Sequence, residues 1–567
     1  MAIKQVRNVG QYGVISDIPA HAIPVNAWTD ARNVSFTGYS VTKRAGFVPE
    51  IDTAKEDIAT YLTSAKIHEI IPSLNEAQGQ LETVTVYAGN KHVWRRALDG
   101  TISLMDKSGN PGYNASLDYP WRSTNFSNAV VLTNPNDFPQ AMSVSDLRLS
   151  DLPAWGVNTV GGTDNTEYWR TPKIASYKNF LIALSTTEGP DKESAVYRPQ
   201  RVRWSDISDV GQLPQSWDEA SLTNSAGYMD LTDATGAFVE ALPMRSSLLL
   251  YSNEETFRMT YVGGNTIFRF DKVFDDLGVL NQHCVGKFGM KHIVVTDTDV
   301  RVHDGSSHTS IVEGLIKERL FREIRSANSI SEVKVKVRES ASEVWICYKS
   351  NASTPTGYQD MAAIFNWEDN TWTFADLPNT TVVQEVPDVT PSNKKRWEDY
   401  TDVVNNTWGS IAEAGNRWSS LTRLTGDLFM TGFCQDNAIL RLSDKSTNQL
   451  QGRDEFGEFI ITPLSISLRR DGFDFDVEGA PLNSFKKVKA VYPQFVGDGI
   501  ITIDVGGRNL PNDKTLYQQT CHYFINNDYK ADYRINARYF SISFSELDDT
   551  QWQFTDYDID FELGGIK

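Results

Sequence analysis

A short acidic string near residue 475 has the residue types of a cation-binding loop. Asp474, Asp476 and Glu478 precede Gly479, as in the opening of a calcium-binding loop. Such a loop needs a bidentate carboxylate at its twelfth position to complete the oxygen shell, and Phe485 stands there. We therefore predict an acidic turn and assign no metal ligand.

Two other groups of residues have side chains that catalysis could use. His303 and Asp304 could exchange protons, but an Asp304-Gly305 pair after a predicted strand is typical of a turn. Adjacent carboxylates such as Asp275 and Asp276 also occur, and with 73 acidic residues some adjacency is unavoidable. Glycosidases need two carboxylates that face each other across a cleft, which a sequence does not show. No catalytic residue is predicted.

Motifs that bind nucleotides or activate water are missing from the sequence. It contains no Gly-x-x-x-x-Gly-Lys-Ser/Thr loop, no His-Glu-x-x-His pair and no Gly-x-Ser-x-Gly elbow. The string Val505-Gly506-Gly507 comes nearest to a dinucleotide fingerprint but lacks its glycine spacing. We expect a protein that is not an enzyme and has no cofactor.

The spacing of the cysteines and the hydropathy of the chain indicate the cellular compartment of synthesis. The four cysteines have neither zinc-site nor redox-motif spacing, and they are Cys284, Cys347, Cys434 and Cys521. Reduced thiols and synthesis in the cytosol are expected in a chain of this size. Residues 1–13 lack the apolar core of an export signal. No apolar run approaches the roughly 20 residues of a membrane span, so we expect a soluble protein without a membrane span.

Composition favours a globular, all-β protein. The 567 residues are 40% hydrophobic and 22% charged, and aromatic residues, which favour strands, reach 11%. The net charge is −19, opposite in sign to that of a protein that grips DNA. An acidic surface repels phosphate and promotes solubility.

The elements that would position any site are short strands. Apolar or alternating runs are separated by Gly, Asn, Asp and Pro, and hairpin turns are predicted at 263–265, 297–299 and 368–370. A series this long exceeds one sandwich but suits a β-propeller, in which blades are added radially and cover one another's edges. We predict a β-propeller core with an additional small β domain and a long polar loop.

Three segments depart from this pattern. Helical periodicity is best at 311–324 and weaker at 51–61. Residues 376–425 are polar and contain Trp397, Trp408 and Trp418, which predicts a long loop held to the body by its tryptophans. From about residue 454 the strands resemble those of a compact β domain.

One N-terminal segment resembles a known family. Residues 23–36 (IPVNAWTDARNVSF), Gly38 and residues 41–47 (VTKRAGF) resemble the signature of the tail nozzle proteins of short-tailed phages, which include tail tubular protein B and packaged-DNA-stabilisation proteins. Further similar stretches follow in the family's order. These are residues 201–209 (RVRWSDISD), 261–264 with 268–270, 302–305, 314 with 320–321, 537–544 (ARYFSISF), and 551–552 with 557–560.

The resemblance implies a fold, an assembly and a function. The implied fold is a β-propeller, and the implied assembly is a homohexameric ring below the portal and the tail adaptor ring. The axial channel of such a ring retains the packaged genome and conducts double-stranded DNA without sequence preference. Tail fibres or tail tip proteins are further candidate partners. The virion tail is the implied location.

These expectations divide the chain into three parts. Residues 1–50 form a strand-turn-strand signature that joins the propeller. Residues 51–453 form the propeller core, with the tryptophan-bearing loop at 376–425. Residues 454–567 form a C-terminal β domain that packs back on the propeller. For the channel, the net charge of −19 predicts an acidic lining, with loops at its narrowest point.

Two alternative functions stay open. The first is a β-propeller tail protein that binds or cleaves glycans, for which the only candidate is the tryptophan-bearing loop with Glu398, Asp399 and Asp402. The second is an adhesive scaffold outside any phage, which only the family resemblance disfavours.

Overall fold

The structure is a computed structural model that describes residues 2–564 except 55–65, 78–79, 98–100, 127, 157–166, 210–211, 222, 265, 388–427, 443–446, 476–483, 511–512, 547 and 549. Strands dominate the described residues. The helical segments among them are α2 (Lys317–Ser326) and two 3-10 helices, η1 (Ile330–Glu332) and η2 (Glu339–Ala341). The predicted all-β class is confirmed.

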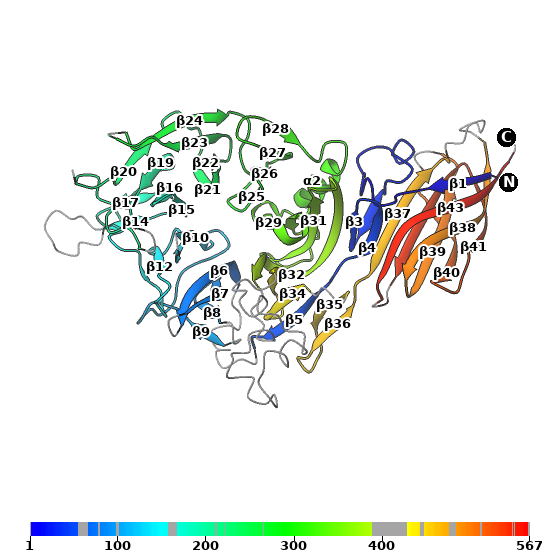
Figure 1. The fold of residues 1–567 in the computed structure, drawn as a ribbon, viewed down its shortest axis with the longest axis horizontal. Helices are drawn as coiled ribbons and strands as arrows, with labels where there is room; N and C mark the ends of the chain where they lie inside the picture. The colour runs from blue at the N-terminus through cyan, green and yellow to red at the C-terminus, as the bar shows by residue number, and fades with distance from the viewer. Residues whose placement is uncertain are drawn as a thin grey trace, which may run out of the picture.

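Antiparallel four-stranded blades are arranged in a ring on the left of Figure 1 and form a β-propeller. The first blade contains β6 (Ile67–Ala77), β7 (Gln80–Gly89), β8 (Val93–Arg96) and β9 (Ile102–Leu104). The second contains β10 (Arg122–Phe126), β11 (Ala129–Thr133), β12 (Gln140–Met142) and β13 (Ser150–Asp151). The third contains β15 (Lys173–Tyr177), β16 (Phe180–Leu184), β19 (Arg201–Trp204) and β20 (Gly227–Asp230).

The next blades continue around the ring. The fourth contains β21 (Phe238–Met244), β22 (Ser247–Ser252), β23 (Thr256–Tyr261) and β24 (Phe268–Phe274). The fifth contains β25 (Val285–Phe288), β26 (Lys291–Val295), β27 (Val300–His303) and β28 (His308–Ser310). A small separate sheet beside the third blade contains β14 (Tyr168–Arg170), β17 (Thr187–Gly189) and β18 (Val196–Tyr197).

The last two blades share one long strand, β32 (Thr371–Pro387), and a strand from the N-terminal part closes the ring. The first half of β32 completes the sixth blade with β29 (Lys334–Arg338), β30 (Glu343–Tyr348) and β31 (Gln359–Asn366). Its second half begins the seventh blade with β33 (Leu428–Cys434), β34 (Ala438–Leu442) and β5 (Phe47–Asp52). β32 also contacts β6 of the first blade, so the two ends of the propeller meet.

Packing between blades explains the continuous apolar runs in the sequence. All five residues of β16 (Phe180–Leu184) are buried, because neighbouring blades cover both faces of the third blade. Val131 of β11 and Leu181 of β16 belong to one hydrophobic cluster between the second and third blades. Each fully buried large aliphatic side chain stabilises the fold by about 1.5–3 kcal/mol.

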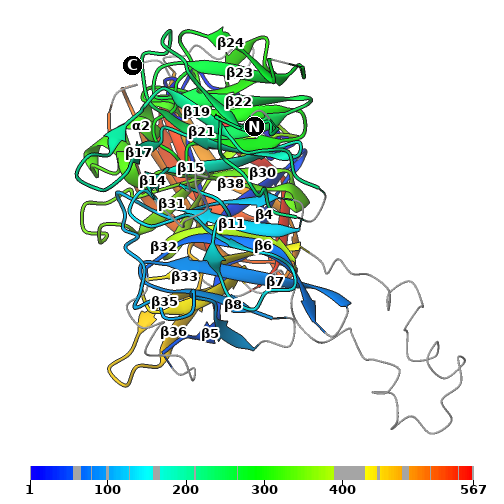
Figure 2. The ribbon, with the colours of Figure 1, turned by 90° about the vertical axis from the view of Figure 1, so that its left-hand side faces the viewer.

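A second body of two facing sheets lies beside the propeller (Figure 1) and behind it in the view of Figure 2. One sheet contains β3 (Val34–Thr37), β4 (Ser40–Lys43), β43 (Trp552–Leu563), β38 (Lys486–Gly497) and β41 (Ala531–Ala537), with β1 (Ala2–Val6) also on β43. The other contains β37 (Ile466–Phe473), β42 (Tyr539–Glu546), β39 (Ile500–Arg508) and β40 (Leu516–Phe524). β2 (Asp30–Arg32) pairs with both β37 and β32, so this sheet continues into the sixth blade.

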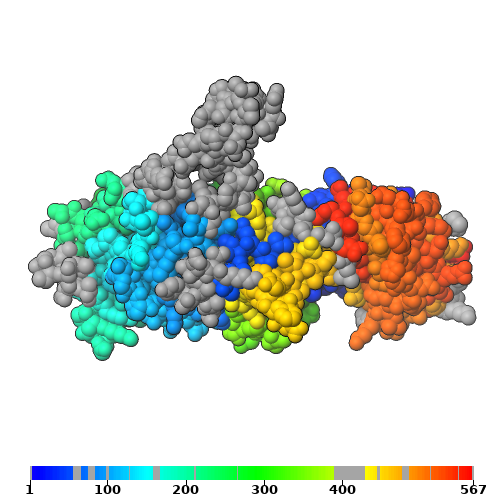
Figure 3. Space-filling model, turned by 90° about the horizontal axis from the view of Figure 1, so that it is seen from below, coloured from blue at the N-terminus to red at the C-terminus, as the bar shows by residue number. Residues whose placement is uncertain are grey.

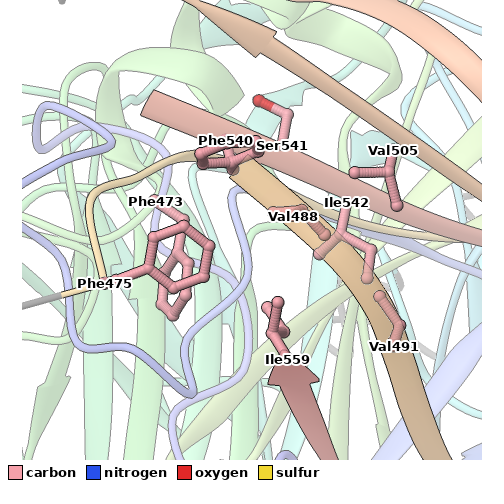
Figure 4. Close-up of a pocket in the computed structure, with 9 residues that line it drawn as sticks. All are labelled: Phe473, Phe475, Val488, Val491, Val505, Phe540, Ser541, Ile542 and Ile559. Atoms are coloured by element: carbon pink, nitrogen blue, oxygen red, sulfur yellow. The ribbon is translucent and has the colours of Figure 1, made fainter. Parts of the chain in front are cut away.

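The apolar space between the two sheets is almost completely filled. The cavity in Figure 4 measures about 10 Å³, and eight of the nine residues that line it are apolar, among them Phe473, Phe540 and Ile559. A space of this size holds at most one water molecule. The C-terminal body therefore has a packed core here and no ligand cavity.

The structure adds detail to one predicted connection and corrects two predicted boundaries. The signature hairpin β3–β4 was expected to join the propeller; it pairs with β43 of the C-terminal body, and β3 also contacts propeller strand β32, where the Thr373 hydroxyl donates to the Val34 carbonyl. Strand β32 extends to Pro387, so its second half occupies the predicted start of the loop at 376. The hairpin of β35 (Asn448–Arg453) and β36 (Phe459–Pro463) crosses the boundary predicted at 454.

The predicted hairpin turns are confirmed, and the better helix prediction overlaps α2. The three predicted hairpins join β23 to β24, β26 to β27 and β31 to β32. The helix predicted at 311–324 begins later, at Lys317. Ile51, at the start of the weaker helix prediction, lies in strand β5, and residues 55–61 of that prediction lie outside the described residues. Among the described residues no helix is both long and apolar enough to cross a membrane.

Candidate functional site

The segment that carries the family resemblance forms the joint between the propeller and the C-terminal body. Figure 3 shows N-terminal residues in blue between the propeller strands and the orange and red C-terminal strands. Lys43, at the end of β4, forms an ion pair of 3.0 Å with Glu546 of β42, and both side chains are buried. The next residue, Arg44, forms two hydrogen bonds of 2.8 and 3.1 Å with Glu343 of β30 in the sixth blade. Two successive residues thus bind different bodies, Lys43 the C-terminal body and Arg44 the propeller.

Arg44 and Glu343 are a buried, two-pronged pair. Burial alone raises the pKa of the Glu343 carboxyl. Arg44, with smaller contributions from Arg338 and Trp345, outweighs burial and holds that pKa below its ordinary value. Arg44 also lies over the ring of Trp345 at 5.3 Å, and the indole N–H of Trp345 donates to Glu343. A planar guanidinium can donate to both carboxylate oxygens of Glu343 at once, which a lysine ammonium group does less well.

Aromatic packing joins the N-terminal signature to the C-terminal stretches that also carry the resemblance. Trp28 contacts Phe544, Phe554 and Tyr557 with ring centroids 6.1, 6.3 and 6.4 Å away. Its indole N–H donates to the carbonyl of Val9 at 2.8 Å, so the buried polar atom is satisfied. The signature and the C-terminal stretches therefore form one core, although they lie at opposite ends of the sequence.

Asn33 fixes the path of the chain through the joint. Its backbone is left-handed, with φ 59°, a conformation that asparagine tolerates better than most residues. Its side-chain amide donates to Asp376 and to the carbonyl of Ser465, each at 2.7 Å, and its backbone N–H donates to the carbonyl of Phe374 at 2.8 Å. One side chain thus connects β32 with the segment that enters the C-terminal body.

The RVRWSD stretch, which begins at Arg201, connects the third blade with the small sheet beside it. Arg201 and Arg203 project from the same face of β19, two residues apart, and both bind Glu188. Burial acts to raise the pKa of Glu188, but the two arginines lower it further than burial raises it. Glu188 belongs to β17, so this ion-pair network attaches the small sheet to the third blade.

His303 and Asp304 form no catalytic pair. The His303 ring is buried and shares a hydrogen bond of 2.9 Å with the Tyr251 hydroxyl, and burial lowers its pKa to about 3. Asp304 accepts hydrogen bonds from the backbone of Ser307 and Ser306, which lower its pKa. These bonds close the β27–β28 turn, so the predicted turn is confirmed.

Other sequence candidates also have plain structural roles or lie outside the described residues. Gly506 stands at a bulge of β39, where a Cβ atom would lie 2.1 Å from the Leu516 carbonyl oxygen. This close approach of the backbone explains why the residue is glycine, and no nucleotide-binding role is needed. Asp476 and Glu478 of the calcium-like string are not described, nor are Glu398, Asp399, Asp402 and the three tryptophans of the loop. In the part of the chain that is described, no three His, Cys, Asp or Glu residues gather to hold a metal ion.

The cysteines are free thiols, as expected from their spacing. Burial raises the pKa of Cys284 and of Cys347 to about 12, which keeps both protonated and unreactive at neutral pH. Cys521 is the one that is partly exposed.

A charged cluster that no sequence motif predicts lies at the axis of the propeller, and we call it the axial cluster. The innermost strands of different blades supply its members, and these are Glu69 of β6, Arg122 of β10, Lys173 of β15, Glu240 of β21, His283 before β25, and Lys334 and Lys336 of β29. Arg122 and Lys173 both form ion pairs with Glu240, the latter at 2.9 Å. These residues share no motif or spacing, so only the closure of the ring brings them together.

The electrostatics of the axial cluster reflect burial and an excess of positive charge. Burial, with the neighbouring Lys336 charge, lowers the pKa of Lys334 to about 8. Burial also lowers the pKa of Lys173 and of His283. For Glu69 the effect of neighbouring charge exceeds that of burial. Burial acts to raise its pKa, but the nearby cations lower it further. The site thus favours negative charge.

Known proteins resemble this chain only weakly, and only in structure. No family model and no curated protein matches the sequence. YCF48 bound to D1 peptide matches at 10% identity and TM-score 0.30, over 70% of this chain and 95% of that chain. Human WBSCR16 matches at 9% identity and TM-score 0.29, over 67% and 96%. PorZ of Porphyromonas gingivalis matches at 7% identity and TM-score 0.32, over 83% and 45%. Likeness at this level says nothing about function.

Proposed function

We propose that this chain is a structural nozzle of a short-tailed phage tail. In this proposal it forms a homohexamer on the tail axis below the adaptor ring, and its ring forms the distal part of the DNA channel. It retains the packaged genome, conducts it during ejection and catalyses no reaction. The chain is made in the host cytoplasm and assembled into the virion tail, where fibres or tip proteins are further candidate partners.

One observation supports the proposal most directly. The stretches that resemble the nozzle family at the two ends of the chain meet in a single joint, where the Trp28 ring lies 6.1 Å from that of Phe544 and 6.4 Å from that of Tyr557. One hydrophobic cluster runs from the sixth blade through Trp28 to both sheets of the C-terminal body. A subunit whose two bodies share a core is stiff, and stiffness suits the wall of a channel that holds DNA under pressure.

The charge distribution is compatible with a conduit. Basic side chains are at least as numerous as acidic ones among the buried residues, so the net charge of −19 arises from residues that are not buried or not described. A wall with many lysines and arginines would bind phosphates and slow the passage of DNA. An acidic wall repels DNA over about 8 Å at physiological salt.

Imaging of the assembled tail tests the proposal. We expect electron microscopy of virions to show six copies of this chain as a ring coaxial with the DNA and in contact with the adaptor. A peripheral trimer in its place would refute the nozzle and favour the glycan-directed alternative.

A structure of the assembled ring would show which acidic residues face the channel. The rate of genome ejection then tests whether their negative charge acts on DNA. Replacing several of them by lysine should slow genome ejection in vitro, and the slowing should fade at high salt. A matched variant carries the same number of lysines on the outer surface of the ring. If ejection at low salt is unchanged while assembly is intact, the charge does not act on DNA.

A further inference from the structure

The axial cluster contains more positive than negative charge in a place with little water. Four of its members are cationic and two are carboxylates. Its histidine, His283, and the neighbouring His68 have lowered pKa values that keep them neutral. Arg122, Lys173 and Lys334 are between 6% and 8% exposed. Burying an uncompensated charge is costly, and the cost falls when a counter-ion is present.

The ion pairs that exist leave part of the axial cluster without a carboxylate. Glu240 already accepts both Arg122 and Lys173. Within the described part of the chain, Lys334 donates to the backbone carbonyl of Thr381, at 2.8 Å, and no carboxylate lies within ion-pair distance of it. Lys336 donates to the Gln384 amide oxygen at 3.1 Å and lies 3.8 Å from Glu69.

Several polar atoms of the axial cluster are also buried without a hydrogen-bond partner among the described residues. Two are nitrogens, Arg122 Nε and His283 Nε2, and one is an acceptor, Glu69 Oε2. Buried polar atoms are ordinarily paired, so their concentration at one place is informative. A ligand for this site must bring negative charge to the cations and a donor to Glu69.

We propose that the axial cluster binds inorganic phosphate. The lysines and Arg122 hold its charged oxygens, and a protonated phosphate oxygen donates to Glu69 Oε2. Sulfate has the same shape and charge but carries no proton at neutral pH, so it would place an oxygen against the Glu69 carboxylate without a donor. A site built around an unpaired acceptor rejects a ligand that cannot donate to it. Arg122, Lys173 and Lys334 are at most 8% exposed, so we expect bulky ligands such as nucleotides and DNA to be excluded.

The inference is independent of the nozzle function, since it requires only one folded chain. Thermal unfolding and titration calorimetry of the full-length protein test it, with phosphate, sulfate, chloride and ATP compared at matched ionic strength. Phosphate should raise the unfolding temperature in a saturable way, because a ligand that binds only the folded state stabilises it. Sulfate should bind at least about tenfold more weakly. ATP and chloride should have no saturable effect.

Two variants locate the site. Lys336→Gln should weaken phosphate binding about tenfold or more, whereas Lys291→Gln, an exposed lysine of β26, should leave it unchanged. Lys336 lies at the margin of the axial cluster, so the variant keeps its buried neighbours. Glu69→Gln supplies an amide donor where the carboxylate stood, and the preference for phosphate over sulfate should fall.

Several outcomes would overturn the proposal. They are stabilisation by phosphate no greater than that by chloride, an unchanged affinity in Lys336→Gln, or binding of ATP as strong as that of phosphate. A Glu69→Gln protein that folds and keeps the full preference for phosphate would overturn the assigned hydrogen bond.

Discussion

Lys43 and Arg44 are adjacent in the chain, yet their side chains bind opposite bodies of the molecule. Lys43 pairs with Glu546 in the C-terminal body, and Arg44 pairs with Glu343 in the sixth blade. All four side chains are buried. Because side chains on an extended chain alternate in direction, two consecutive residues can connect two bodies that lie on either side of it. This alternation gives the signature segment a physical role as a bridge.

Removing one partner of the first pair should weaken the joint strongly. Lys43→Met leaves Glu546 buried without its cation, which costs about 3–5 kcal/mol. We expect the urea midpoint of unfolding, followed by tryptophan fluorescence, to fall accordingly. The double variant Lys43→Met with Glu546→Gln should recover much of the loss, because the amide oxygen still accepts the Trp552 indole N–H.

A surface substitution is the matched control for this test. Lys487→Met removes an exposed lysine of β38 and should change the midpoint little. A Lys43→Met protein as stable as the wild type would show that the ion pair does not hold the joint.

Asp17 should stabilise helix α2 from outside it. The Asp17 carboxylate accepts the backbone N–H groups of Glu318 at 2.8 Å and Arg319 at 3.4 Å, which are first-turn donors. Asp17→Ala should lower the free energy of unfolding by about 1 kcal/mol, and Asp17→Asn by less, since an amide oxygen still caps. Equal losses in the two variants would mean that the negative charge, not the hydrogen bond, is what matters.

The buried His292 should make the protein sensitive to acid. Its Nε2 donates to the Pro243 carbonyl, so its Nδ1 accepts from the Tyr251 hydroxyl at 2.7 Å, and the ring is neutral. Burial lowers its pKa to about 4, below the ordinary value of 6.5. The unfolded chain therefore binds more protons between these values, and stability falls as the pH drops from 6.5 towards 4.

The variant His292→Asn separates this residue from the other buried histidines. We expect it to be less stable at pH 7 but to lose less stability than the wild type between pH 6.5 and pH 4, as measured by urea midpoints at several pH values. Parallel pH profiles for the two proteins would contradict the assignment of His292.

Assays on host glycans address the alternative function. We expect the purified protein to leave capsule and lipopolysaccharide intact, with no release of reducing sugar. Should release occur and be abolished by Glu398→Gln or Asp402→Asn, the glycan-cleaving alternative would be preferred to the nozzle.

Local chemistry explains which features could be predicted. The hairpin at Gly263 and Gly264 was predictable because both glycines take positive φ, 74° and 71°, within the turn itself. The start of α2 was not, because its cap comes from Asp17, which lies 301 residues earlier. Likewise the turn at Asp304 is closed by its own neighbours, whereas nothing near Lys334 in the sequence indicates an axial cluster.

Strand and turn preferences act between neighbouring residues, so the amino-acid sequence is enough to predict the all-β class, the strand pattern of the blades and most hairpins. Three features follow from long-range contacts and could not be predicted: the signature hairpin pairs with the C-terminal body, β5 closes the seventh blade, and Glu69, Arg122 and Lys334 meet at one axis. Such arrangements depend on long-range strand pairing and on ring closure. The alternation of polar and apolar residues shows that a strand has a buried face, but not which distant strand covers it.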